Sequence, residues 1–473
     1  MRKFPDILLK LNFWILILIA AQVAAIIFLC LYIPSVLPVV AALALIWLLS
    51  AISATVLFTR AGAPEVKCVW FVVIAAVPVA GALVYLLASV KSKPCGVLTV
   101  KGARDGGLSL AAGACCGTAE AGYHSAKYFK SGNDFFNSAI ETVKSAKTSV
   151  FVEFYIIGRG HVYNTFFQAL KAAKENGAEI KIILDGMGSA FRLGKKDFKK
   201  LKELGAEIKI FHKLLPLAHS KLNLRDHRKL IVIDGKTAYT GGLNLADEYV
   251  NVNSPYGYWK DTGVAVSGSA AKIFEGMFLA MWHGSHEMPA PDRAESEKRV
   301  CLPFYDSPPR RSFYEDALIC ALSSAKERVH IFTPYFCLSD KTAAALAFTA
   351  RRGVDVKVII PHVPDKKYAF EVSKAFAHTM KYSGVKIYEY TPGFMHAKSV
   401  ICDDKVFIGS YNFDFRSTHF NYEAGVVFGD DIAVCVERDF QECLALSAEA
   451  THGKLSHAKR MHRFLLRFFS PLI

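Results

Sequence analysis

The chain carries two copies of one strand–helix–strand pattern, far apart in the sequence. Short apolar runs rich in β-branched residues predict strands, and apolar residues spaced three or four apart predict helices. The strand, helix and strand fall at Thr148–Ile157, Thr165–Glu175 and Gly177–Leu184 in the first copy, and at Arg328–Phe336, Thr342–Arg351 and Gly353–Ile360 in the second. Copies this far apart indicate a duplicated domain rather than a solenoid. We therefore expect two α/β halves that face each other across a pseudo-twofold axis.

Polar residues repeat together with the predicted strands. Each copy has an H-x-K-x4-D motif followed by a G-[G/S]-x-N segment. The motif residues are His227, Lys229, Asp234 and Asn244 in the first copy, and His396, Lys398, Asp403 and Asn412 in the second. Because residues two apart in a strand share a face, the histidine and lysine of each motif point the same way. One such motif arises easily by chance, but two at matching places predict a shared site.

A carboxylate also repeats at the head of an apolar strand in each half. Asp261 begins the run to Val266, and Glu423 begins the run to Phe428. A carboxylate beside an imidazole fixes its tautomer and stabilises its protonated form, so we expect Asp261 and Glu423 to support the two histidines. The motif aspartates, Asp234 and Asp403, are counted with the catalytic motif, and we expect them to hold the turn after each strand.

The N-terminal region differs sharply from the rest of the chain. Only three charged side chains, Arg60, Glu65 and Lys67, occur between residues 11 and 90. The apolar runs are Phe13–Ile33, Val39–Phe58 and Cys68–Val90, each about the 20 residues that a membrane-spanning helix needs. We expect residues 1–95 to form a membrane anchor with two or three transmembrane helices. Basic residues flank both ends, so orientation stays open, although we favour a multi-pass protein of the cell membrane whose globular region faces the cytoplasm.

Charge and cysteine usage narrow the possible partners. With 57 basic and 42 acidic residues, the net charge of +15 suits either anionic lipid or nucleic acid. The apolar runs favour lipid, and nothing resembles a separate nucleic-acid module, so we expect no nucleic-acid partner. The 11 cysteines include no C-x-x-C pair, and no H-x-H or carboxylate-rich cluster is present. We therefore expect no metal and no other cofactor.

The C-terminal stretch His452–Ile473 alternates Lys and Arg with Phe and Leu. Two interpretations are equally open. The stretch can lie in a membrane interface, or it can be an ordinary amphipathic helix that packs on the protein.

The paired motifs carry a resemblance to a known family. Together with Trp259–Asp261, Thr333–Phe336 and the closing Arg467–Ile473, they make the sequence similar to the phospholipase D superfamily, and within it to the bacterial cardiolipin synthases. The likeness covers nearly the whole chain. One departure concerns the loop Ile157–Tyr163, which lacks the acidic residue that the resemblance leads us to expect.

The resemblance implies a fold and a reaction. The fold is two phospholipase D-like α/β/α halves, residues 120–300 and 301–473, behind the transmembrane segment. The reaction moves a phosphatidyl group from one phosphatidylglycerol to another through a phosphohistidine, giving cardiolipin and glycerol without metal. By this resemblance His227 is the nucleophile and His396 the acid and base. The two motifs themselves are equivalent and do not distinguish these roles. Phosphatidylglycerol and anionic membrane lipids are the expected partners, and oligomeric state is undetermined.

The same resemblance assigns the phosphate ligands and leaves alternatives. Lys229, Lys398, Asn244 and Asn412 are expected to hold the nonbridging oxygens as charge builds on them. A phospholipase D-type hydrolase of phospholipids or other phosphodiesters needs the same histidines and stays open. A catalytically silent membrane scaffold is the other alternative, but such a protein is expected to have lost motif residues, and none is missing here.

Overall fold

The structure is a computed structural model of the whole chain. It describes residues 24, 27–28, 36–60, 62–88, 95–101, 120–189, 192–212, 223–308, 312–450 and 456–472. The chain divides into two compact units. The first comprises Met1–Ser92, Leu214–Asn223 and Phe468–Ile473, and the second comprises Lys93–Lys213 and Leu224–Arg467.

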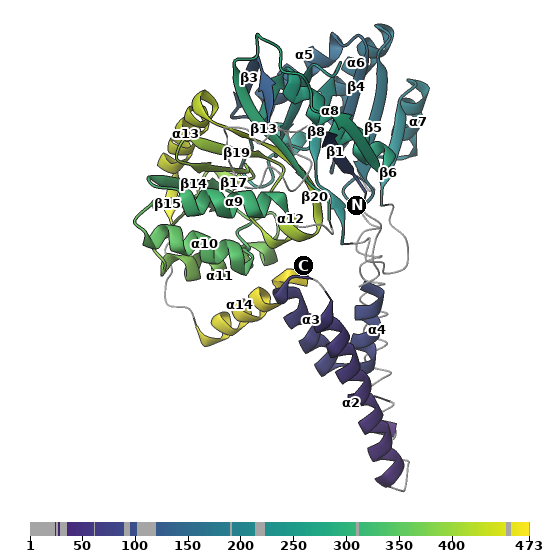
Figure 1. Cartoon of the computed structure of the whole chain (residues 1–473), viewed down its shortest axis with the longest axis vertical. Coiled ribbons are helices and arrows are strands. Elements are labelled where there is room, and N and C mark those ends of the chain that lie inside the picture. The colour runs from purple at the N-terminus through teal and green to yellow at the C-terminus, as the bar shows by residue number, and fades with distance from the viewer. Residues whose placement is uncertain are drawn as a thin grey trace. The chain divides into compact units, whose positions relative to one another are not determined.

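The first unit contains the apolar helices. They are α2 (Val36–Thr59), α3 (Pro64–Ala76) and α4 (Pro78–Ala88), and a short 3-10 turn, η3 (Ser470–Leu472), packs against α3 (Figure 1). Within the described residues, α2 is the one helix long and apolar enough to cross a membrane, with 24 residues and a mean hydropathy of 2.4. At 1.5 Å per residue its length exceeds the ~30 Å of a bilayer core.

The predicted third span is not one continuous helix. The run Cys68–Val90 breaks after Ala76, and a new helix starts at Pro78, because proline has no N–H with which to continue a helix. The two pieces, of 13 and 11 residues, are each too short to cross a bilayer. The predicted first span, Phe13–Ile33, falls almost wholly outside the described residues. The described part of the chain thus carries one candidate span, and it does not support the multi-pass expectation.

The second unit contains two sheets with the same strand order. In the first half the order is β3 (Ser125–Phe129), β11 (Gly263–Ser267), β9 (Thr237–Gly241), β8 (Lys229–Ile233), β4 (Ser149–Phe154), β5 (Glu179–Asp185) and β6 (Glu207–Phe211). In the second half it is β2 (Ala121–Tyr123), β13 (Arg299–Asp306), β20 (Asn421–Phe428), β19 (Lys405–Gly409), β18 (Ser399–Cys402), β14 (Arg328–Phe332), β15 (Asp355–Pro361), β16 (Lys386–Tyr390) and β21 (Ser447–Glu449). In both halves three neighbouring strands run parallel, and the next one is antiparallel to them.

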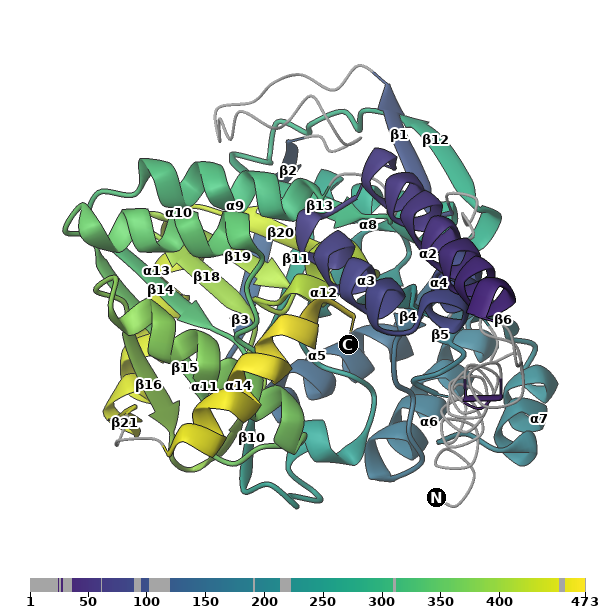
Figure 2. The same cartoon turned by 90° about the horizontal axis from the view of Figure 1, so that it is seen from below.

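Helices cover both faces of each sheet. The first half has α5 (Gly132–Lys144), α6 (His161–Glu175) and α7 (Lys195–Glu203) outside and α8 (Ser269–His283) inside; the second has α9 (Phe313–Ser324), α10 (Asp340–Arg351) and α11 (Lys367–Lys381) outside and α13 (Asp430–Ala445) inside. Figure 2 shows α9 and α10 side by side along the second sheet. One hydrophobic cluster includes α8, α13 and the facing sides of both sheets. The two halves therefore share a core.

The remaining elements are short, apart from the last helix. Among them are β1 (Val97–Lys101), β12 (Ser285–Pro289), η2 (Asp247–Val250), α12 (Phe415–His419) and α14 (His457–Phe469). The predicted fold class, two repeated α/β halves with an apolar helix before them, is confirmed. The predicted strand–helix–strand copies correspond to β4, α6 and β5 and to β14, α10 and β15.

Candidate active site

Two short strand pairs join the halves where the motif histidines lie. β7 (Arg225–Asp226) of the first half runs parallel to the start of β20, and β10 (Tyr258–Lys260) runs parallel to β17 (Gly393–Met395) of the second half. His227 follows β7, and His396 follows β17. The backbone N–H of His227 donates to the carbonyl of Tyr422 at 2.9 Å, and that of His396 donates to the carbonyl of Lys260 at 2.7 Å.

These backbone bonds pair each histidine with a carboxylate of the other half. Glu423, directly after Tyr422, has its carboxylate oxygens 2.9 and 3.0 Å from Nδ1 of His227. Asp261, directly after Lys260, has Oδ2 2.5 Å from Nδ1 of His396. Both carboxylates are fully buried, and the two imidazole side chains are only 12% and 8% exposed. A carboxylate that accepts the N–H of Nδ1 fixes the tautomer in which Nε2 carries the lone pair of the ring.

The two pairs differ in how the carboxylate is supported. Ser410 donates its hydroxyl to Glu423, and Asn421 donates to the same carboxylate at 3.2 Å. Gly242 holds the equivalent position to Ser410 in the first half, and a Cβ there would meet Oδ1 of Asp261 at 2.1 Å. The first motif therefore has glycine where the second has serine for a steric reason. The carboxylate of Asp261 lies where the side chain of a serine at position 242 would be.

Both motif lysines are buried beside the histidines. Lys229 donates to the carbonyl of His227, and Lys398 donates to the carbonyl of His396 at 2.6 Å. Nζ of Lys398 also lies over that ring, 2.9 Å from Nδ1 and 3.2 Å from Nε2. Burial lowers the pKa of Lys229 to about 7 and that of Lys398 to about 8. An anion placed between them would restore their full charge, so these groups can bind a phosphodiester.

Burial and the lysines act on the other ionisable groups of the site as well. Burial, with help from Lys398, lowers the pKa of His396 to about 4, and burial followed by Lys229 lowers the pKa of His227 well below its usual range. Burial raises the pKa of Glu423 to about 7. Both imidazoles are consequently neutral at pH 7 in the empty site, and a neutral imidazole is what a nucleophile or a general base requires.

The two asparagines differ in their surroundings. Asn244 accepts from the N–H of Ile156 at 3.1 Å and donates to the hydroxyl of Tyr249 at 2.6 Å, so its amide already bonds within the first half. Burial raises the pKa of Asp414, and the amide of Asn412 offsets part of that rise. Oδ1 of Asn412 is buried with no hydrogen-bond partner in the described residues. Asn412 thus has an acceptor still to satisfy, whereas Asn244 also serves to fix Tyr249.

The motif aspartates lie away from the histidines. Asp234 is at the other end of β8 from His227, in a turn with φ of 53°, and accepts from the N–H groups of Lys147, Thr148 and Ser149 at 2.7–3.1 Å. Asp403 has the same φ and accepts from the equivalent loop before β14. The geometry therefore does not support the predicted catalytic part for these two aspartates, because both close a turn at the far end of the strand.

Aromatic rings complete the surroundings of His396, and sequence patterns did not single them out for this role. Trp259, Tyr249 and Phe394 have ring centroids 5.0, 5.3 and 5.7 Å from that of His396. His227 has Tyr155 at 5.2 Å. These rings come from η2, β10, β17 and the end of β4, so no local motif connects them. The cations Lys366 and Arg416 were missed for the same reason, although both help to lower the pKa of His227.

The loop Ile157–Tyr163 obtains its carboxylate from elsewhere in the chain. Asp247 accepts from the N–H groups of His161 and Val162 at 2.9 and 3.0 Å, at the start of α6. Gly160 permits this approach, since a Cβ there would lie 2.2 Å from Oδ2 of Asp247. An acidic cap is thus present at this helix N-terminus without an acidic residue in the loop itself.

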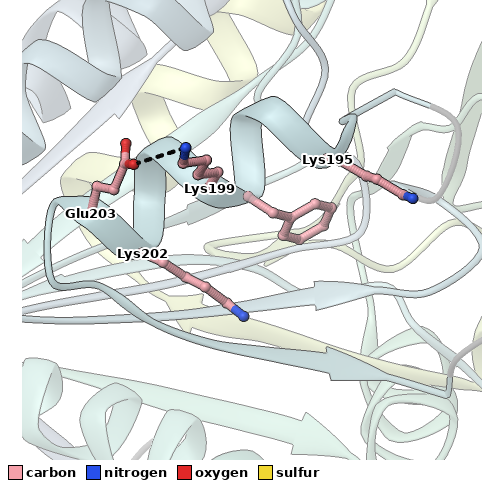
Figure 3. A pocket seen from close by; sticks show the side chains of 5 residues that line it. Lys195, Lys199, Lys202 and Glu203 are labelled. Carbon is pink, nitrogen blue, oxygen red and sulfur yellow. Dashed lines mark ion pairs between the residues drawn. The ribbon is translucent and has the colours of Figure 1, made fainter.

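Other features lie apart from the histidines. A surface hollow is lined by α7 residues alone, Lys195, Phe198, Lys199, Lys202 and Glu203, and includes no motif residue (Figure 3). Among the residues that the structure describes, no group of three or more His, Cys, Asp or Glu side chains is arranged to hold a metal ion.

Comparisons with known proteins agree with this geometry. The family model described as "Cardiolipin synthase, PLD-like domain" matches residues 139–282 and 318–444, and each stretch contains one copy of the motif. Cardiolipin synthase 2 of Bacillus cereus is 30% identical over 72% of this chain and 69% of its own length. A cardiolipin synthase of Staphylococcus aureus is 30% identical over 71% and 69%. An uncharacterised protein of Streptococcus mutans is 35% identical over 73% and 78%.

A solved structure shares the fold. The phosphatidylserine synthase of Haemophilus influenzae covers 75% of this chain and 95% of its own, with a TM-score of 0.57 and 13% identity. Two repeated α/β halves with a histidine and a lysine from each at their junction define a phospholipase D-like protein. Within that class, the chain belongs to the cardiolipin synthase family.

Proposed function

We propose that the protein is a cardiolipin synthase, a phosphatidyltransferase that converts two molecules of phosphatidylglycerol into cardiolipin and glycerol. The observation that carries this proposal is the crossed pair of dyads, His227 with Glu423 and His396 with Asp261, beside two buried lysines. A phosphodiester can be cleaved by such a site when a nucleophile, a proton donor and cationic oxygen ligands are prepositioned. Membership of the cardiolipin synthase family supports the choice of substrate.

In the first step, Nε2 of His227 attacks the phosphorus of one phosphatidylglycerol. A P–N bond forms, the bond from phosphorus to the headgroup glycerol oxygen breaks, and that oxygen takes a proton from Nε2 of His396. Lys229 and Lys398 stabilise the negative charge on the nonbridging oxygens. The products of this step are free glycerol and a phosphatidyl group on His227.

In the second step, the headgroup of another phosphatidylglycerol is the acceptor. Its terminal hydroxyl gives its proton to Nε2 of His396 and attacks phosphorus, and the P–N bond breaks. His227 returns to its neutral form, His396 regains the proton it lost, and cardiolipin leaves. If water took the place of the acceptor, the product would be phosphatidic acid.

The protonation of His396 depends on the substrate. Burial and Lys398 hold its pKa at about 4 in the empty site, so it carries no proton on Nε2 at neutral pH. A bound phosphodiester adds a negative charge next to Lys398 and so raises the pKa of the imidazole. We infer that Nε2 of His396 takes up a proton from solvent when the substrate binds, and that this proton later leaves with glycerol.

Membrane lipids are the proposed partners, and the membrane is the proposed location. The apolar helix α2 would keep the site near a bilayer, and exposed Lys and Arg attract anionic headgroups at roughly 1 kcal/mol each. A cytoplasm-facing active site stays a prediction.

The test uses purified, detergent-solubilised protein with phosphatidylglycerol alone and no added metal. Cardiolipin with an equal amount of free glycerol, lost in His227→Ala and in His396→Ala, is the expected result. Phosphatidic acid alone would instead mean a hydrolase, and no turnover would contradict the proposal. Brief incubation with phosphate-labelled phosphatidylglycerol should leave an acid-labile, alkali-stable label on the wild-type protein. That label should be absent from His227→Ala.

A further inference from the structure

Two arginines of the C-terminal helix α14 point to the protein. Arg463 is buried and pairs with Glu371 of α11 at 2.9 Å. Arg467 donates to the hydroxyl of Thr379 at 2.8 Å and lies 4.7 Å from the ring centroid of Phe376. Three contacts along α11 therefore set the rotation of α14 about its own axis.

Leu466 packs on the same side as these two arginines, against the core of the second half, whereas three other apolar side chains point outward. Met461, Phe464 and Leu465 are 59%, 63% and 46% exposed. Their spacing of three and four residues puts them on one stripe of the helix. Leaving such side chains in water forgoes the free energy that their burial would contribute. A helix held in this orientation by an ion pair, a hydrogen bond and a cation–ring contact has an apolar face that requires a partner.

We propose that this face of α14 lies in the headgroup region of an anionic lipid bilayer, with Met461, Phe464 and Leu465 directed toward the acyl chains. Lys459 and Arg460, both exposed in the first turn, would contact lipid phosphates. A second copy of the chain is the less suitable occupant, because three side chains cover far less than the roughly 1,200 Å² that a stable protein interface buries.

Continuity with the apolar unit supports a lipid partner. α14 passes directly into η3, and Phe468–Ile473 belong to the same compact unit as α2, α3 and α4. η3 packs against α3. The last residues of the chain are thus part of the unit that holds the candidate membrane span.

The proposed lipid contact would also affect the orientation of the active site. The contact itself does not depend on the proposed reaction. α11, the helix that binds Arg463 and Arg467, begins at Lys367, next to Lys366. Lys366 is one of the cations that lower the pKa of His227. A bilayer that holds α14 would therefore set the orientation of the active site relative to its lipid substrates.

The test is photo-crosslinking of the full-length protein in nanodiscs that contain phosphatidylglycerol and phosphatidylethanolamine. The photoreactive residue p-benzoylphenylalanine replaces Phe464 in one variant and Val434 of α13, 58% exposed, in a matched control. We expect several-fold more lipid adduct at position 464 than at 434, and less in nanodiscs of neutral lipid. Equal labelling, or a protein–protein adduct at 464, would overturn the proposal.

A second variant separates membrane contact from catalysis. Leu465→Asp is expected to slow turnover of phosphatidylglycerol in nanodiscs several-fold while leaving unchanged the turnover of a short-chain, monomeric phosphatidylglycerol. Val434→Asp should affect neither. Equal losses on both substrates would mean that α14 is structural only. If neither lipid is turned over by the wild type, the reaction fails while the crosslinking result still stands on its own.

Discussion

The carboxylate of Glu423 lies 2.9 Å from Nδ1 of His227, although the two residues belong to opposite halves of the repeat. The reciprocal pair, Asp261 with His396, crosses in the other direction. Neither half therefore contains a complete dyad. The shared core of α8, α13 and the two sheets is what keeps the dyads in register.

We expect Glu423→Gln to lower kcat by about 10²- to 10⁴-fold, because an amide does not stabilise the imidazolium that develops in the reaction. Release of glycerol from phosphatidylglycerol measures the effect. Glu437→Gln is the matched control, since Glu437 lies 2.9 Å from Nδ1 of His330, outside the site. An equal loss in both variants would argue against a role for Glu423 in the chemistry.

The pH dependence should follow the two lysines. Lys229 and Lys398, with pKa values of about 7 and about 8, are charged below these values and neutral above them. We expect kcat/KM to fall as the pH rises through 7 to 8, because a neutral amine binds the phosphodiester weakly. Bound substrate raises both pKa values, so kcat should fall at a higher pH than kcat/KM. Coincident profiles would contradict this electrostatic account.

Asp234→Asn should affect stability more than chemistry. The Asp234 carboxylate accepts from three successive N–H groups at the end of β8 distant from His227. We expect the free energy of unfolding to fall by about 1–3 kcal/mol, with kcat of the folded fraction retained. Denaturant unfolding beside an activity assay checks both. A large loss of kcat without loss of stability would return Asp234 to the catalytic groups.

The buried ion pair between Lys260 and Asp439 should position the second dyad. Nζ of Lys260 lies 2.7 Å from Oδ2 of Asp439, and the carbonyl of the same lysine holds the N–H of His396. Asp439→Asn leaves a buried ammonium without its counter-ion, and we expect about 3–5 kcal/mol less stability and a lower kcat.

The control for that variant is on the same helix. Glu442 of α13 pairs with Lys130 at 2.8 Å, but both side chains are at least half exposed. Glu442→Gln should therefore have little effect on stability and leave kcat unchanged. Similar effects in the two variants would mean that the Lys260–Asp439 ion pair does not position the second dyad.

Local patterns were sufficient to predict the halves, the strand–helix–strand copies and the paired histidines, lysines and supporting carboxylates. Each of these depends on residues close together in the chain, where alternation, helical spacing and motif order reflect the backbone directly. The same is true of α2, whose apolar length is a local property. The interruption of the next run also has a local cause, Pro78, which membrane helices sometimes tolerate and this one does not.

Contacts between distant residues could not be predicted in this way. The sequence predicts Asp261 and Glu423 as the supporting carboxylates. That each one contacts the histidine of the other half follows from the pairing of β7 with β20 and of β10 with β17. The bonding of the Asn244 amide to Tyr249 and the inward arginines of α14 likewise depend on which surfaces meet. Such pairings leave no periodic pattern in the sequence. They form between remote segments, and burial and hydrogen bonding stabilise them only once the two halves have packed together.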